Sequence, residues 1–340
     1  MFQTEINIGL QALGSKALTW LMYHITTTGY YSFVIALVLV IMLGVNLRKG
    51  FLLLQIIAWT AIVSQIVKDL FGLPRPFFTD SRVTCLEPGW DAATPFRAQG
   101  APSFFSLPSR TVVEAFRLRG LNCGFPSGHV TGSVALWGGL AVLFRKRWLL
   151  WLAPIVITLM AFSRLYLGVH FLADVLGAIL LGVIMLSLAY LFIGSTEGQR
   201  RFFSAVKAKA SSALPLILYI FILFILPILF AVFANIPAVF VGFYIGLNAA
   251  FTLILVKGLP EDGGSLLVRA TRVVLCGLLY FLINWASSQA LHLLHVPTDA
   301  AWIGFIVAGL GSFLTLWGSV KLFLKLGLYK ESTSVLSREQ

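Results

Sequence analysis

Long apolar segments recur along most of this 340-residue chain and constrain its fold more than any other feature. Apolar stretches of about 17–25 residues can cross a bilayer as helices. The chain is 59% hydrophobic and 11% charged, whereas about 25% of the residues of a soluble protein are charged. We therefore predict an all-α, polytopic membrane protein of about nine transmembrane helices. The segments, of which the third is short, are 29–46, 51–71, 130–144, 148–166, 171–193, 213–234, 236–256, 271–290 and 301–326.

The pattern of apolar and polar segments predicts four parts of the chain. Residues 1–28 mix polar and apolar side chains, as expected of an interfacial helix that lies on the membrane. Residues 29–193 carry the first five apolar segments and include a long loop at 77–125. A polar, basic linker at 194–212 then precedes residues 213–340, which form a four-helix membrane extension and a tail.

The net charge of +12 is concentrated in particular loops. If nine spans alternate, these loops all lie on one side, which the positive-inside rule makes cytoplasmic. The N-terminus and loop 77–125 then lie on the exoplasmic (periplasmic) side. This distribution indicates topology and attraction to anionic lipid, and it argues against a nucleic-acid partner. The basic groups are Arg48–Lys49, Arg145–Arg147, Arg200–Lys209, Lys257–Arg272 and Lys330–Arg338.

Three polar motifs stand at the edges of apolar segments. The first runs from Lys68 to Arg75-Pro76, the second is Pro126-Ser127-Gly128-His129, and the third runs from Ser163-Arg164 through His170 to Asp174. Together they supply three cations, two histidines and one carboxylate.

His170 and Asp174 are four residues apart, which places them on one face of a helix. Asp174 can accept the imidazole N–H and leave the lone pair of the other nitrogen free, which prepares a histidine nucleophile. A buried structural His–Asp pair is the alternative interpretation.

Lys68, Arg75 and Arg164 would repel one another at one membrane edge unless an anion joined them. Arginine forks match pairs of phosphate oxygens. Taken singly, each cation could instead extend to the membrane interface.

The second motif opens the third apolar segment. We expect Ser127 to cap this helix and donate to phosphate, while Gly128 permits close approach of the backbone. His129 is then placed to protonate a leaving oxygen; a histidine merely satisfied at the interface is the alternative. Because no acidic cluster suited to Mg²⁺ occurs, we expect no metal or other cofactor.

At these residues the chain resembles the type 2 phosphatidic acid phosphatase (PAP2) superfamily, whose pattern is K-x6-RP, PSGH and SR-x5-H-x3-D. The resemblance covers roughly residues 29–193. It implies a metal-independent phosphoric ester hydrolase of the membrane-bound lipid phosphatase branch. In that reading His170 forms a phosphohistidine, Asp174 stabilises its imidazolium and His129 transfers protons. The implied phosphate-binding residues are Lys68, Arg75, Ser127, Gly128 and Arg164.

Several functions remain open at this stage. Candidate substrates are phosphatidate, phosphatidylglycerol phosphate, polyprenyl diphosphate and sphingoid-base phosphate. A glucose-6-phosphatase-like hydrolase of a soluble sugar phosphate is the runner-up. A transporter built on the last four segments is disfavoured by their lack of internal charges. Vanadate-dependent haloperoxidases share the motifs, but those relatives are soluble.

Loop 77–125 contains Phe77, Phe78, Phe96, Phe104 and Phe105, and a possible capping box starts at Thr111. The helix that follows carries Arg110, Arg117 and Arg119. It would either touch lipid head groups or pack only on protein. An oxidising exoplasmic space would favour a disulfide between Cys85 and Cys123.

Overall fold

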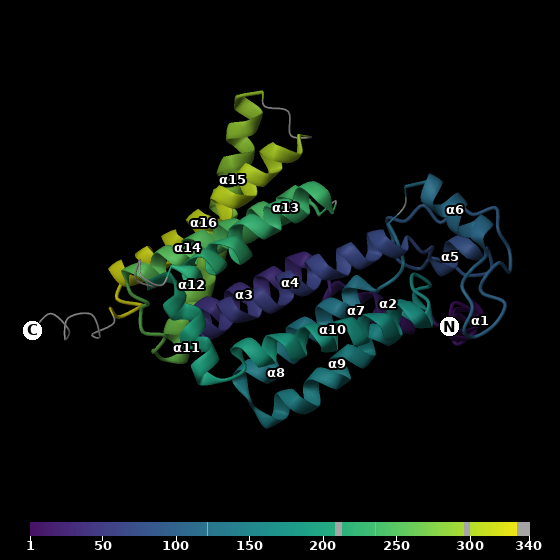
Figure 1. The fold of residues 1–340 in the computed structure, drawn as a ribbon, viewed down its shortest axis with the longest axis horizontal. Coiled ribbons are helices and arrows are strands. Elements are labelled where there is room, and N and C mark those ends of the chain that lie inside the picture. Colours follow the sequence, from purple (N-terminus) through teal and green to yellow (C-terminus); the bar gives the residue numbers. More distant parts are fainter. Residues whose placement is uncertain (121, 208–212, 235, 296–299, 332–340) are drawn as a thin grey trace, which may run out of the picture. The chain divides into compact units, whose positions relative to one another are not determined.

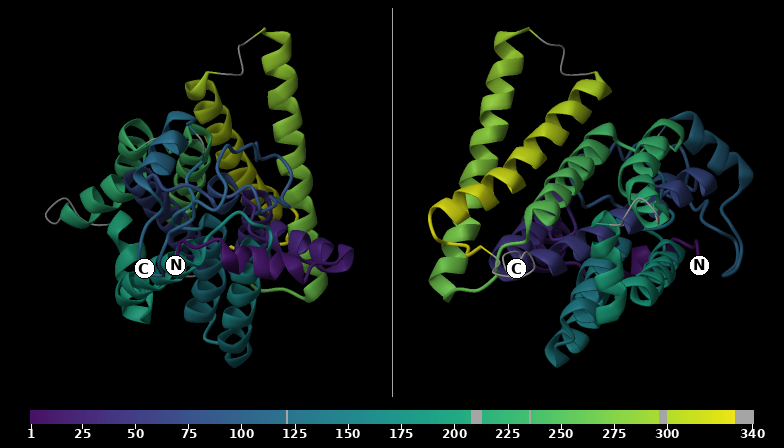
Figure 2. Two further views of the ribbon diagram at one scale, coloured as in Figure 1. Left: turned by 90° about the vertical axis from the view of Figure 1, so that its right-hand side faces the viewer. Right: turned by 60° about the vertical axis from the view of Figure 1, so that its left-hand side comes forward.

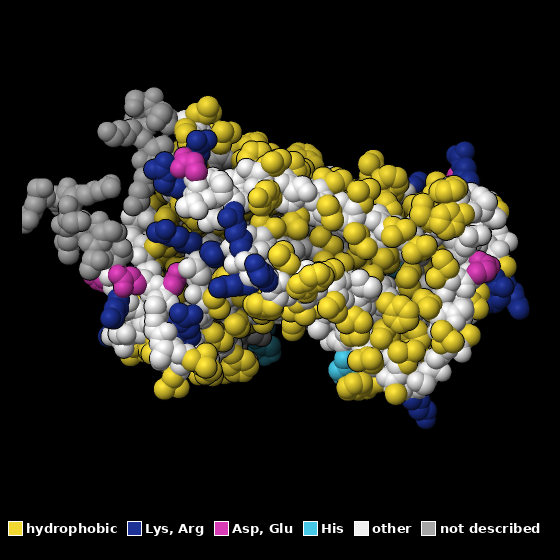
Figure 3. Space-filling view, turned by 90° about the horizontal axis from the view of Figure 1, so that it is seen from below, with side chains coloured by type: hydrophobic (Ala, Val, Ile, Leu, Met, Phe, Trp, Pro, Cys, Tyr) yellow, Lys and Arg dark blue, Asp and Glu magenta, His cyan; other side chains and the backbone are white. Residues whose placement is uncertain are grey.

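The computed structural model describes residues 1–340 apart from 121, 208–212, 235, 296–299 and 332–340. The described residues form helices and no strand, with one isolated bridge between Glu261 and Lys330 (Figure 1). This confirms the all-α prediction. Hydrophobic side chains cover much of the face drawn in Figure 3, as expected for helices that meet lipid.

Among the described residues, seven helices are long and apolar enough to cross a membrane. An eighth span results if Lys16–Thr27 and Tyr31–Val45, which are bent by 56° at their junction, are taken together. The expected segment 130–144 belongs to a shorter apolar helix, Gly128–Phe144. The count of nine spans therefore stays a prediction.

The chain divides into two compact units, and the first comprises residues 1–35 and 55–191. The division of the chain at 194–212 stays a prediction. The helices that lie wholly or partly in the first unit are α1 (Glu5–Ala12), α2 (Lys16–Thr27), α3 (Tyr31–Val40), α4 (Leu47–Phe71), α5 (Pro76–Thr79), α6 (Arg110–Leu118), α7 (Gly128–Ser133), the π-helix η2 (Val134–Gly138), α8 (Gly139–Phe144), α9 (Arg147–Tyr166) and α10 (Leu172–Ile193).

Two glycines shape the chain beside the polar motifs. Helix α4 ends at Phe71, and Gly72 follows it with φ +56°, a left-handed conformation that suits glycine. Gly168 has φ +75° in the turn between α9 and α10. A Cβ there would lie 2.5 Å from the Thr84 carbonyl oxygen. This turn lets Arg164 and His170 approach each other.

Helix α6 packs on the protein. Val112 and Phe116 are 1% and 0% exposed and join a core that includes Phe77 and Phe78. The expected capping box is wrong, because the Ser109 side chain caps the helix instead, accepting from Val112 N. Arg117 donates to the Phe71 and Gly72 carbonyls at the end of α4. The loop therefore shares a core with α2 and the end of α9, while Phe104 and Phe105 remain exposed.

The second unit comprises residues 36–54 and 192–340. Its helices, beyond the parts of α3, α4 and α10 that belong to it, are the π-helix η1 (Ile41–Val45), α11 (Thr196–Ser204), the 3₁₀ helix η3 (Ala205–Lys207), α12 (Leu214–Ile220), the π-helix η5 (Phe221–Ile225), α13 (Leu226–Phe233), α14 (Ala238–Lys257), α15 (Leu266–Leu293) and α16 (Ala301–Lys325).

Small residues let α14 and α16 pack closely, side by side in Figures 1 and 2. A Cβ added at Gly242 or Gly246 would come within 2.1 Å of the carbonyl oxygen of Phe305 or Gly309. Glycines four residues apart on one helix face are typical of such contacts in membranes.

One prediction about this unit is wrong. Arg272 was placed in a basic loop, but it lies in α15 and is fully buried. Its Nη2 donates to the Asp262 and Gly263 carbonyls, and its guanidinium lies 4.4 Å from the centre of the Tyr329 ring. Backbone carbonyls and an aromatic face therefore stabilise the buried charge of Arg272.

Candidate active site

A cavity of about 330 Å³ in the first unit gathers most of the residues expected at the site. Ser127 and Asp174 lie beside it and are joined through the backbone, where Ser127 N donates to the Asp174 carbonyl at 3.0 Å. The three motifs, far apart in the sequence, thus meet at one place. The predicted site residues that line the cavity are Lys68, Arg75, Gly128, His129, Arg164 and His170.

His170 is fixed on both sides of its ring. Its Nδ1 lies 3.1 Å from Asp174 Oδ2, which also accepts from Phe171 N at 2.9 Å. Its Nε2 lies 3.1 Å from Arg75 Nη1. Because Arg75 can only donate, Nε2 carries the lone pair and Nδ1 carries the proton. Burial and the charges of Arg75, Arg164 and Lys68 hold the pKa of His170 well below its usual value, so the ring is neutral at pH 7.

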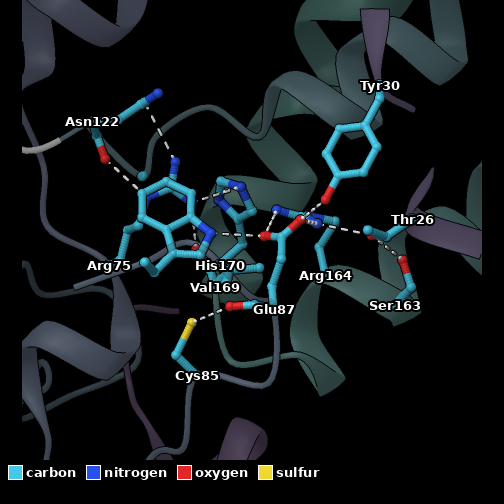
Figure 4. Close-up of polar contacts among 12 residues, drawn as sticks. Thr26, Tyr30, Arg75, Cys85, Glu87, Asn122, Ser163, Arg164, Val169 and His170 are labelled. Atoms are coloured by element: carbon cyan, nitrogen blue, oxygen red, sulfur yellow. Dashed lines mark hydrogen bonds and ion pairs between the residues drawn. The ribbon is translucent and has the colours of Figure 1, made fainter. Parts of the chain in front are cut away.

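Arg75 and Lys68 are held by backbone carbonyls. Besides His170, Arg75 donates to Val169 O at 2.8 Å and to Asn122 O at 2.8 Å (Figure 4). Its guanidinium also lies 4.1 Å from the centre of the Trp90 ring. Lys68 Nζ donates to Cys123 O at 2.8 Å. Both cations are at most 7% exposed, and this concentrated positive charge favours an anion in the cavity.

Arg164 is held by Glu87, a residue that the sequence motifs did not single out. Arg164 Nη1 and Nη2 donate to Glu87 Oε1 and Oε2, each at 2.9 Å, and Nη1 also donates to Thr26 Oγ1 (Figure 4). Glu87 accepts further bonds from Tyr30 Oη and Trp90 Nε1. The carboxylate therefore receives four hydrogen bonds and balances one cation of the cluster.

Ser127 and His129 each keep a buried polar atom that accepts or donates no hydrogen bond within the described residues, Ser127 Oγ and His129 Nε2. The prediction that the Ser127 side chain caps the helix is wrong, since α7 has no side-chain cap. The His129 and Tyr30 rings meet in a T-shaped contact, with the ring centres 5.2 Å apart. Because buried polar groups are normally paired, both atoms point to a ligand.

The loop residues that complete the site were missed for a physical reason. Glu87, Trp90 and Asn122 lie in a loop without periodicity, so their direction cannot be read from spacing. The motifs contain more cations than carboxylates, which indicates that an acidic residue elsewhere pairs with one of the cations. However, Asp80 and Asp91 lie in the same loop as Glu87, so the sequence does not show which of them forms this pair.

Within the described part of the chain, no group of three or more His, Cys, Asp or Glu side chains is arranged to hold a metal ion. The expected disulfide is not formed. The Cys85 thiol donates to the Glu87 carbonyl instead, at 3.5 Å, and burial raises its pKa.

Comparison with known proteins agrees with the three motifs. The sequence model of the PAP2 superfamily matches residues 49–197. A lipid A 4'-phosphatase of Porphyromonas gingivalis is 34% identical over 91 residues, which are 27% of this chain and 39% of that protein. The undecaprenyl-diphosphatase BcrC of Bacillus subtilis is 35% identical over 85 residues, 25% of this chain and 42% of that protein.

A more distant relative is sphingosine-1-phosphate phosphatase 2 of Mus musculus, 24% identical over 143 residues, 40% of this chain and 32% of that protein. The chain thus spans less than half the length of each of these relatives. No solved structure matches. With the apolar helices, these similarities identify an integral membrane protein. Residues 49–197, which contain all three motifs of the cavity, are thus similar to the PAP2 superfamily.

Proposed function

We propose that this protein is a membrane phosphatase that hydrolyses a lipid phosphate monoester or diphosphate through a phosphohistidine. One observation carries the proposal: a single cavity is lined by His170, His129 and three buried or nearly buried cations, and it continues along apolar helix faces. The names of the relatives, which refer to lipid A, undecaprenyl diphosphate and sphingosine 1-phosphate, support a lipid substrate.

In the first half of the reaction, His170 Nε2 attacks phosphorus. The phosphoryl oxygens replace Nε2 as acceptors of the Arg75 N–H, and Lys68 and Arg164 stabilise their charge. The bond to the leaving oxygen breaks, and His129 gives that oxygen a proton. Asp174, which accepts from His170 Nδ1, stabilises the imidazolium of the phosphohistidine.

In the second half, His129 accepts a proton from water, and the resulting hydroxide attacks phosphorus. The P–N bond breaks, and its electron pair restores neutral His170. The protein's cations provide the electrostatic stabilisation in both halves, so the reaction as proposed needs no cofactor.

The shape of the cavity favours a lipid over a soluble sugar. Its α4 lining consists chiefly of Ile57, Ala61, Gln65 and Lys68, which are spaced three or four residues apart on one helix face. At about 1.5 Å per residue this face extends about 16 Å from Lys68. Val34 from α3 also lines the cavity. A lipid chain can occupy this face while its phosphate meets the cations.

We place the site on the exoplasmic side of the membrane, because the basic loops predict the opposite side to be cytoplasmic. A lipid head group could then reach the cavity while its tail stays in the bilayer.

A phosphate-release assay on the purified full-length protein tests the proposal. The panel comprises phosphatidate, phosphatidylglycerol phosphate, a polyprenyl diphosphate, a sphingoid-base phosphate and glucose 6-phosphate. We expect release from at least one lipid at a higher kcat/KM than from glucose 6-phosphate. Faster turnover of the sugar phosphate would favour the glucose-6-phosphatase-like alternative, and no release from any substrate would refute a phosphatase.

A further inference from the structure

Helix α1 contacts the turn that carries His170, although α1 lies outside the part of the chain matched by the family. The side chain of Asn7 is fully buried. Its Nδ2 donates to Leu165 O at 2.8 Å and to His170 O at 3.0 Å. One amide group thus links the residue after Arg164 to His170 itself.

Both hydrogens of the Asn7 amide are used in this link. Its Oδ1 is buried and has no partner among the described residues. Leaving such an acceptor unpaired costs about 1–3 kcal/mol. A residue selected only to fill space would avoid this cost. The amide at this position is therefore best explained by the two backbone oxygens to which it donates, those of Leu165 and His170.

Neighbouring contacts fix α1 itself. Gln11, one helical turn after Asn7, donates from Nε2 to Tyr166 O and Thr84 O. On the other side of His170, Ala173 N donates to Met1 O, and the Phe2 ring packs edge-on against Phe171. The first residues of the chain thus contact the segments before and after His170, the proposed nucleophile.

We propose that Asn7 is a positioning residue that sets the placement of His170 relative to Arg164. The inference rests on the proposed function, in which His170 attacks a phosphoryl group held by Arg164. Because both donors of the Asn7 amide bond to backbone oxygens of this turn, Asn7 acts through the turn and not by touching substrate. A residue outside the PAP2 motifs would then be required for full catalytic rate.

The test compares Asn7→Ala with the unmodified protein, using kcat, KM and the inhibition constant of orthovanadate. Vanadate bound beside a histidine resembles the transferring phosphoryl group, so its affinity reports the placement of His170. An inhibition constant does not depend on the fraction of protein that is folded. Gln11→Ala is the matched control, because Gln11 also bonds to backbone carbonyls but not to that of His170.

For Asn7→Ala we expect kcat to fall about 10- to 100-fold. The inhibition constant of vanadate should rise about tenfold, while KM changes less because the cations are intact. Gln11→Ala should keep kcat and the inhibition constant within about threefold. If Asn7→Ala does not fold, Asn7→Ser, which keeps a single donor, is measured against the same criteria.

An unchanged kcat in the Asn7 variant would overturn the inference, and so would a fall in activity with no change in the inhibition constant. Inactivity of the unmodified protein on every substrate would instead refute the proposed function. The two failures are therefore distinguishable.

Discussion

Arg164 and Glu87 form a buried pair with two parallel hydrogen bonds of 2.9 Å, and their side chains are 1% and 3% exposed. Glu87 accepts one hydrogen bond from each terminal nitrogen of the guanidinium, Nη1 and Nη2. Thr26 Oγ1 accepts the second hydrogen of Nη1. Arg164 Nε is buried and has no partner among the described residues. The N–H of Nε and one N–H of Nη2 share a side of the planar group, so this side is left for two phosphoryl oxygens.

Replacement of Glu87 should therefore impair catalysis. In Glu87→Gln the amide cannot accept all four bonds, and Arg164 loses its fixed orientation. We expect kcat/KM for the best lipid substrate to fall about 10- to 100-fold. The matched control is Glu114→Gln in the same loop, where Glu114 is 56% exposed and pairs with Arg110. Equal effects of the two substitutions would refute the role assigned to Glu87.

The same carboxylate should make stability depend on acidic pH. Burial alone would raise the pKa of Glu87, but the hydrogen bonds and charge of Arg164 lower it to about 2. A carboxyl whose folded-state pKa lies below the unfolded value of about 4.3 stabilises the protein above that value, and this contribution is lost as pH falls towards 2. Thermal unfolding between pH 5 and 3 should thus depend less on pH in Glu87→Gln than in the unmodified protein. Identical slopes of the unfolding temperature against pH in the two proteins would show that the Arg164–Glu87 pair does not stabilise the fold.

The position of His129 depends on Gly29. A Cβ at Gly29 would lie 2.5 Å from His129 Cδ2. Gly29→Ala should therefore displace the proposed proton donor and lower kcat about tenfold or more for a lipid phosphate. A substrate whose leaving group needs no proton should be affected less. Gly9→Ala is the control, because a Cβ there has no neighbour within 4 Å; similar losses in both variants would contradict this account.

The apolar part of the cavity should control which substrates are used. Ala61→Trp fills the face of α4 between Ile57 and Gln65. We expect kcat/KM to fall about tenfold for a long-chain lipid phosphate and to change little for a soluble short-chain phosphate. Leu180→Trp on α10, where Leu180 is 63% exposed, serves as the control. A uniform loss on both substrates would argue that the lipid chain lies elsewhere.

Turnover should not require a divalent metal, since the cavity presents cations where a metal would otherwise act. Activity of the purified protein is measured before and after treatment with a chelator. We expect no more than a twofold change. A large loss that Mg²⁺ restores would mean that the proposed role of the cations is wrong.

The fold and the centre of the site could be predicted because local rules govern them. Apolar length sets the helices. The four-residue spacing of His170 and Asp174 also pointed to their contact of 3.1 Å, although His170 lies just before α10, which begins at Leu172. Glycine at positions 72 and 168 permits the left-handed conformations that the chain adopts there.

The remaining features depend on contacts between distant residues. Asn7 lies 158 and 163 residues from its two partners, and the mixture of polar and apolar residues at 1–28 predicts only an interfacial helix. Glu87 lies in an irregular loop that offered other carboxylates. The chemistry of a residue was readable from the sequence, but its partner across the fold was not.

The central claim is that His170 becomes phosphorylated. It is tested most directly in His129→Ala with a ³²P-labelled phosphate ester whose leaving group needs no proton, quenched in alkaline SDS because the P–N bond is acid-labile. His170 should carry the label, since attack proceeds but water is no longer activated. The label should be absent when His170→Ala is added. Turnover by His129→Ala without labelled protein, or label on another residue, would contradict the mechanism.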